Sequence, residues 1–189
     1  MKKHADIELR HSAYTDNDGL SSKVALRKKA IERLDKICVL DLFAGENKIW
    51  SKIKTDSYLG IEKEKGKGKN IYADNRLVIP GLDLSKYTVI DCDAYGIPYE
   101  QIQLLYENGT MRSGTVIIYT CISGTLNRLS VRMLKDYGLQ EEYKRSRVLY
   151  NPYSSDMFHA MLHTHGVNKV FCYKNKKTME KEYGYFFVK

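Results

Sequence analysis

From residue 37 to residue 47 the chain reads Ile37-Cys38-Val39-Leu40-Asp41-Leu42-Phe43-Ala44-Gly45-Glu46-Asn47. The first seven residues form a continuous apolar run that contains one acid, and a glycine turn follows the run. Runs of this kind are typical of strands that are buried on both faces of a parallel sheet. The stretch therefore predicts a central parallel strand with a carboxylate and a tight turn at its carboxyl end.

Further short apolar runs predict four more strands, at Tyr58–Glu62, Asn70–Asp74, Tyr87–Asp93 and Thr115–Thr120. Four of the five predicted strands end at a carboxylate. In an open α/β sheet, ligands bind outside the carboxyl ends of the strands. We therefore expect these acids to line one crevice.

Helix signals lie between the predicted strands. Candidate helices run from Ser21 or Ser22 through Asp35, from Pro98 to Asn108 with Gly109 closing it, and from Gly124 to Tyr137 with Gly138 closing it. Near the end, Val167–Tyr173 and Tyr183–Val188 flank a lysine-rich turn and predict a hairpin. The alternation predicts one doubly wound α/β domain over residues 1–189, with 1–36 as an N-terminal extension and helix and 37–189 as the sheet core.

Charge is unevenly distributed along the 189 residues, which carry 31 Lys+Arg against 23 Asp+Glu. Residues 70–111 hold six acidic and two basic groups, whereas residues 112–189 hold thirteen basic and six acidic groups. Basic surfaces attract polyanions, so we expect a nucleic-acid partner, with a merely solvated basic surface as the alternative. No apolar stretch approaches the ~18 residues that span a bilayer, and the start lacks the apolar run of a signal peptide, so we expect a cytoplasmic protein without a membrane partner.

The turn after the first predicted strand resembles the first motif, D-x-F-x-G-x-G, of the class I S-adenosylmethionine-dependent methyltransferases. Asp41, Phe43 and Gly45 match, and Asn47 replaces the second glycine; asparagine tolerates a left-handed backbone better than most residues. The resemblance implies a Rossmann-like fold with a mostly parallel seven-stranded sheet and a C-terminal antiparallel hairpin. It also implies S-adenosylmethionine as cofactor, with Glu62 at its ribose, Asp74 at its adenine amine, and further contacts from Asp41, Phe43, Gly45 and Asp91.

At the end of the fourth predicted strand, Asp91-Cys92-Asp93-Ala94-Tyr95-Gly96-Ile97-Pro98 resembles the D-x-D-P-(F/Y)-G-x-P motif of the tRNA guanine-N2 dimethyltransferase family. Ala94 replaces the proline of that motif. The resemblance implies that Asp93 accepts the hydrogens of an exocyclic base amine, that Tyr95 stacks on the flipped base, and that Pro98 contacts the substrate. It implies methylation of guanine-N2 or adenine-N6, in tRNA or other RNA rather than DNA.

A basic stripe on the helix predicted after Thr120 consists of Arg128, Arg132 and Lys135, at i, i+4 and i+7. We expect it to bind phosphates, with a solvated face as the alternative. His159 and His163 also share helical spacing, but without an H-E-x-x-H motif or a nearby cysteine we predict no metal site.

Two other functions fit the sequence. Asn47 and Ala94 depart from the motifs, which favours a degenerate methyltransferase fold that binds nucleic acid or cofactor without turnover. A methyltransferase for a small molecule or a protein is the second. In addition, fewer than ten residues follow Glu62 before the next predicted strand, too few for an ordinary helix with its turns. We therefore expect thin cover on one face, which leaves the site open or completed by a protein partner or a second copy.

Overall fold

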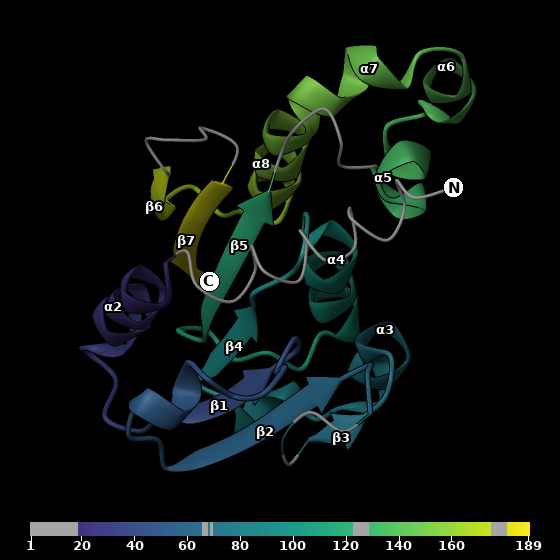
Figure 1. Ribbon diagram of the computed structural model, residues 1–189. Helices are drawn as coiled ribbons and strands as arrows, with labels where there is room; N and C mark the ends of the chain where they lie inside the picture. Colours follow the sequence, from purple (N-terminus) through teal and green to yellow (C-terminus); the bar gives the residue numbers. More distant parts are fainter. Residues whose placement is uncertain (1–18, 66–67, 69, 123–128, 175–180) are drawn as a thin grey trace, which may run out of the picture.

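The fold is built on one seven-stranded sheet with the strand order β3-β2-β1-β4-β5-β7-β6 (Figure 1). The computed structural model describes residues 19–65, 68, 70–122, 129–174 and 181–189. The strands are Cys38–Asp41 (β1), Ser57–Glu62 (β2), Ile71–Tyr72 (β3), Val89–Cys92 (β4), Val116–Ile122 (β5), Phe171–Lys174 (β6) and Lys181–Phe187 (β7).

Strands β1 to β5 pair in parallel, and β7 lies antiparallel between β5 and β6. The prediction of a mostly parallel sheet with a C-terminal antiparallel hairpin, the Rossmann-like class I methyltransferase fold, is confirmed. The strand order reverses between β1 and β4, so the carboxyl ends of these two strands lie side by side. Such a switch point is where open α/β sheets bind ligands.

Seven α-helices are described. They are Leu20–Ile31 (α2), Asn75–Val78 (α3), Tyr99–Asn108 (α4), Val131–Asp136 (α5), Gln140–Arg145 (α6), Arg147–Tyr150 (α7) and Ser154–Thr164 (α8). Single 3₁₀ turns occur at Trp50–Lys52 (η1), Ile79–Gly81 (η2), Leu84–Lys86 (η3) and Asn151–Tyr153 (η4). The helix predicted before Gly109 is confirmed, since Gly109 follows α4 with a left-handed φ of 73°. No described helix has both the length and the apolar composition needed to cross a membrane.

Three predicted boundaries are wrong. Helix α2 begins after Gly19, whose φ is 107°, and ends at Ile31, so neither Ser21 nor Ser22 caps it. Helix α5 begins only at Val131 because the Ser130 hydroxyl accepts a hydrogen bond from the Met133 amide; residues 124–128 of the predicted helix lie outside the described part of the chain. Strand β3 has two residues, because Asp74 leaves the strand to cap α3.

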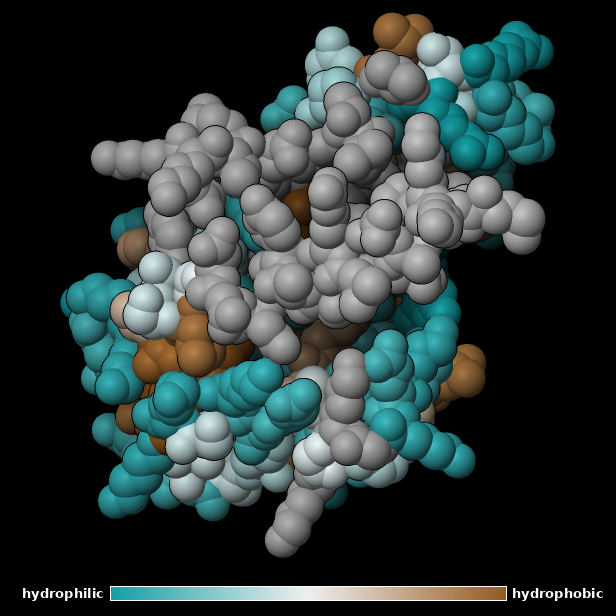
Figure 2. Space-filling view, viewed as in Figure 1, coloured by the Kyte–Doolittle hydropathy of each residue, from teal (hydrophilic) through white to brown (hydrophobic). Residues whose placement is uncertain are grey.

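The two faces of the sheet are covered unequally. On one face, α4, α5 and α8 pack on a large core that includes Leu40, Ile90 and Ile117. The other face, with Val39 and Val89, is covered by α2 and the single turn η1. Figure 1 shows α2 lying beside this face, and Figure 2 shows hydrophilic residues on its outer side. The prediction of one thinly covered face agrees with this arrangement.

Candidate active site

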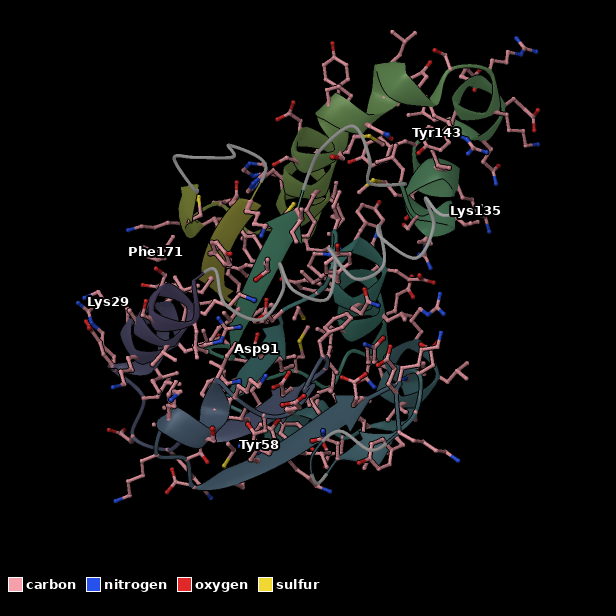
Figure 3. The ribbon with its side chains drawn as sticks, viewed as in Figure 1. Lys29, Tyr58, Asp91, Lys135, Tyr143 and Phe171 are labelled. Carbon is pink, nitrogen blue, oxygen red and sulfur yellow. The ribbon has the colours of Figure 1, made fainter. Side chains whose placement is uncertain are left out.

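The carboxyl ends of β1 and β4 bring two carboxylates together on the thinly covered face. Asp41 and Asp91 are direct partners in the parallel register. Both side chains are buried, and residue alternation along the strands points them to the same face as Val39 and Val89. Figure 3 shows Asp91 near the middle of the molecule, between α2 and the first strands.

Arg27 of α2 neutralises Asp91. Its side chain is 0% exposed, and its Nε and Nη2 donate to the two oxygens of Asp91 at 2.8 and 2.9 Å. The indole Nε1 of Trp50 donates to the same carboxylate at 2.7 Å. Burial raises the pKa of Asp91, and the Arg27 guanidinium partly offsets that rise. In the structure Asp91 therefore holds α2 on the sheet. The predicted contact of Asp91 with a cofactor stays a prediction.

Asp93, just after β4, is held by four polar contacts. Lys23 Nζ donates to its two oxygens at 2.9 and 2.8 Å, and the Thr120 hydroxyl donates at 2.5 Å. Arg27 Nη2 lies 3.3 Å from Oδ2. Burial alone would raise the pKa of Asp93, but the charges of Arg27 and Lys23 hold it below its usual value. Asp93 is therefore an ionised carboxylate that acts only as an acceptor.

Asp41 is the buried partner of Asp91 at the end of β1. Burial, followed by the nearby charge of Asp91, raises its pKa well above the usual value. The Phe43 amide and the Tyr58 hydroxyl donate to it, each at 3.1 Å. Burial and the neighbouring Asp41 likewise raise the pKa of Tyr58. Asp41 therefore orients the turn that follows β1.

That turn has the backbone expected from the sequence. Gly45 and Asn47 have left-handed φ values of 50° and 58°, so the asparagine does take the conformation for which glycine is usual. The Gly45 amide donates to Glu62 Oε2 at 2.8 Å, and the Gly45 carbonyl accepts from Asn70 Nδ2 at 2.9 Å. A Cβ at Gly60 would lie 2.2 Å from Asn70 Oδ1, so close packing requires the glycine. The turn is thus fixed against the carboxyl end of β2.

The remaining predicted cofactor and substrate residues have different surroundings. Asp74 accepts from the Arg76 amide and guanidinium, and these hydrogen bonds lower its pKa. Tyr95 is 60% exposed. Pro98 is buried at the start of α4, where its main role is to begin the helix. Tyr95 is therefore the accessible aromatic residue of this segment.

The predicted basic stripe lies away from this cluster. Lys135 lies on α5, well separated from Asp91 in Figure 3. Arg132 is paired with Glu107 and Asp136, and Arg128 lies outside the described residues. The structure does not bring the stripe to the carboxylates, and its contact with phosphates stays a prediction.

The two histidines considered for a metal lie on α8. His159 Nε2 is 2.8 Å from Glu182 Oε1, an oxygen that also accepts from the Tyr119 hydroxyl at 2.6 Å. Within the described ranges no group of three His, Cys, Asp or Glu side chains is placed to hold a metal ion.

Three residues of the site were missed by sequence reasoning: Lys23, Arg27 and Trp50. The i, i+4 spacing of Lys23 and Arg27 places both cations on one helix face, which is a readable signal. The sequence has no local sign that the partner of Lys23 lies 70 positions further on and that of Arg27 64 positions further on.

Comparisons with known proteins agree with the fold. No protein-family model and no curated protein matches the sequence. The structure is similar to an S-adenosylmethionine-dependent methyltransferase of Archaeoglobus fulgidus, with a TM-score of 0.55 and 12% identity over 88% of this chain and 92% of that one. A methyltransferase described as putative, yhhF of Escherichia coli, gives a TM-score of 0.54 and 10% identity, over 91% of this chain and 85% of yhhF. Trm5b of Pyrococcus abyssi gives a TM-score of 0.50 and 13% identity, over 88% of this chain and 48% of Trm5b. This chain therefore spans about half the length of Trm5b. At such identities the likeness is one of fold.

Proposed function

We propose that the protein transfers a methyl group from S-adenosylmethionine to an exocyclic amine of a nucleic-acid base, guanine-N2 or adenine-N6, in RNA in preference to DNA. One observation carries the proposal: the left-handed turn at Gly45 and Asn47 is tied to Glu62 at the switch point of a class I methyltransferase sheet. Fold alone does not fix the substrate, so the argument rests on this site.

The residues around the turn fit the cofactor. A Cβ built on Gly45 meets no atom within 4 Å, so the backbone there borders open space. Asn47 Oδ1 is buried without a hydrogen-bond partner among the described residues. Each oxygen of Glu62 accepts one amide hydrogen, from Gly45 and Glu64, which leaves one lone pair on each for the two hydroxyls of a ribose. When bound, the cofactor supplies an electrophilic methyl group.

Asp93 and Tyr95 support an amine as the acceptor. An exocyclic amine conjugated with a base is a poor nucleophile, and an ionised carboxylate that accepts its hydrogens restores electron density on nitrogen. Asp93 is kept ionised by Arg27 and Lys23. The ring of Tyr95, two residues on, is 60% exposed and would stack on a flipped base and aim its amine. Catalysis is then positional, with no covalent intermediate.

Two measurements test the proposal. Calorimetry with S-adenosylmethionine is expected to show binding that Glu62→Ala weakens at least tenfold. Incubation with labelled cofactor and total tRNA, or duplex DNA, followed by mass spectrometry of the nucleosides, is expected to identify a methylated guanosine or adenosine. Asp93→Ala is expected to abolish incorporation while leaving cofactor binding intact. A wild-type protein that does not bind S-adenosylmethionine contradicts the proposal.

One observation favours a second candidate, a binding module without turnover. Three acceptor positions of Asp93 are already taken by Lys23 and Thr120, and Arg27 lies against its second oxygen as an ion-pair partner. In a module of this kind the three contacts are permanent and the carboxylate serves only to hold α2. Cofactor or tRNA binding without methyl incorporation, in the wild type and in variants that release Asp93, would establish the module instead.

A further inference from the structure

Asp93 receives two cations from α2, and they differ in how firmly they are held. Arg27 is 0% exposed, bridges Asp91 and Asp93, and also donates from Nη1 to the Lys23 carbonyl at 3.2 Å. Lys23 is 21% exposed, and its ammonium bonds both oxygens of Asp93. Arg27 is thus anchored by two acids and a carbonyl, whereas the ammonium of Lys23 reaches Asp93 from the solvent side.

A count of acceptor positions shows that Asp93 is nearly full. A carboxylate offers about four lone-pair directions. Lys23 takes one on each oxygen, and Thr120 takes the second on Oδ1. Arg27 Nη2, which donates to Asp91, lies 3.3 Å from Oδ2 as an ion-pair partner. One acceptor position is left, on Oδ2, so an amine that donates both of its hydrogens to Asp93 must replace one of these donors.

Lys23 is the donor that can leave at least cost. Its side chain is a flexible stem that ends in a compact, strongly hydrated ammonium, and part of it already lies in solvent. The planar guanidinium of Arg27 is fixed by its fork on Asp91, and Thr120 belongs to β5. After Lys23 leaves, Arg27 and Thr120 still hold Asp93 ionised and oriented.

We propose that Lys23 occupies the place on Asp93 that the substrate amine takes, and that Lys23 withdraws when the substrate binds. The proposal rests on the proposed function. It makes Lys23 a residue that sets substrate affinity: each amine competes with an internal ammonium for one carboxylate. It also accounts for the nearly full acceptor count of Asp93, because the state with Lys23 bound is the resting state of the site.

The test compares Lys23→Met with wild type in methyl transfer to total tRNA and to duplex DNA. Methionine keeps most of the stem and removes the competing charge, so KM is expected to fall about tenfold with kcat within about twofold. Lys28→Met, a change at an exposed lysine of the same helix, is the matched control and is expected to leave both constants unchanged. Lys23→Arg is expected to raise KM severalfold, because arginine binds a carboxylate through a bidentate fork.

A pH profile separates this role from a merely structural one. The titratable groups that face Asp93 are Lys23 and Arg27 from α2, Asp91 from its own strand and Asp41 from β1, with the neutral Thr120 from β5. Loss of the Lys23 charge raises the pKa of Asp93, so the acid limb of kcat/KM is expected to move to higher pH in Lys23→Met. It is expected to stay in place in Lys23→Arg and Lys28→Met.

The outcomes are distinguishable. An active enzyme whose KM and acid limb are the same in wild type, Lys23→Met and Lys23→Arg overturns the role of Lys23 and leaves the proposed function standing. An active wild type, with a lower KM in Lys23→Met and a higher KM in Lys23→Arg, supports both. Absence of methyl transfer by wild type and both Lys23 variants refutes the proposed function, and the role of Lys23 with it. If Lys23→Met does not fold, Lys23→Arg decides whether Lys23 has this role: a rise in KM supports the role, and an unchanged KM overturns it.

Discussion

Replacing Arg27 with methionine tests how much the buried cation of α2 contributes to stability. Removal of one partner from a buried ion pair typically costs about 3–5 kcal/mol, because the other charge stays buried and unpaired. For a chain of this length each kcal/mol corresponds to about 2–4 °C in Tm, so a fall of about 10 °C is expected. The expected loss is a large share of the total stability of an ordinary domain.

The environment of Asp91 places the variant in this range. Its side chain is 1% exposed, and without Arg27 it keeps the Trp50 indole hydrogen bond at 2.7 Å. Asp41 is its register partner on the neighbouring strand. A second substitution, Asp91→Asn, removes the stranded charge while preserving the shape. The double variant is therefore expected to be at least about 2 kcal/mol more stable than the sum of the two single losses predicts.

Urea unfolding followed by circular dichroism measures these free energies. Lys28→Met, at the next position of the helix but exposed, is the control and is expected to leave the midpoint unchanged. A loss below about 1 kcal/mol for Arg27→Met, or strictly additive losses in the double variant, would refute the argument that a buried charge pair holds α2 to the sheet.

Three other changes have defined outcomes. Asp41→Asn is expected to stabilise the protein at pH 8 but not at pH 3, measured as Tm, because burial raises the pKa of Asp41 and the wild type therefore loses stability as the pH rises through that pKa. Gly184→Ala is expected to cost about 1–3 kcal/mol in urea unfolding, since its Cβ would lie 2.5 Å from the Tyr119 ring. Alanine at Arg128, Arg132 and Lys135 together is expected to weaken tRNA binding and lower its salt slope in a filter-binding titration, with S-adenosylmethionine affinity unchanged; an unchanged slope would make the stripe a solvated surface.

The sheet was predictable because its signals are local. Apolar runs locate the central strands, and the residues at their ends, Asp41, Glu62 and Asp93, follow from counting along each run. The turn at Gly45 and Asn47 follows from the two residue types that best tolerate a left-handed backbone. Each of these features depends on a few consecutive residues, and each appears in the structure where the sequence places it.

The packing of the C-terminal helices was missed, although one of the three helices was readable from the sequence. Met157, Phe158, Met161 and Leu162 follow a helical spacing on α8, so that helix was readable from its apolar pattern. Helices α6 and α7 have six and four residues, too short for a periodic pattern to show. Their positions depend on contacts such as Tyr143 with Asn151, which no local rule supplies.

The cations of the site were missed because a charge on a helix is read as solvated unless its partner is known. Val24, Leu26 and Ile31 mark an apolar face, and Arg27 counts toward net charge in any reading of composition. In the fold Arg27 is among the largest fully buried side chains. Its burial is possible only because Asp91 and Asp93 reach the same depth from β4, a coincidence of two distant segments.

Charge balance explains why α2 carries two cations at this point. Asp91 and Asp93 face Arg27 and Lys23, two acids against two cations, and burial raises the pKa of Asp41, which disfavours its charged form. The cluster is then close to neutral, which is the condition for burying several charged groups together. The predicted division into an extension over 1–36 and a sheet core over 37–189 separates these partners. Because Leu26, Ala30 and Ile31 also belong to the core of the thinly covered face, the chemistry of Asp93 cannot be separated from the helix that precedes the first strand.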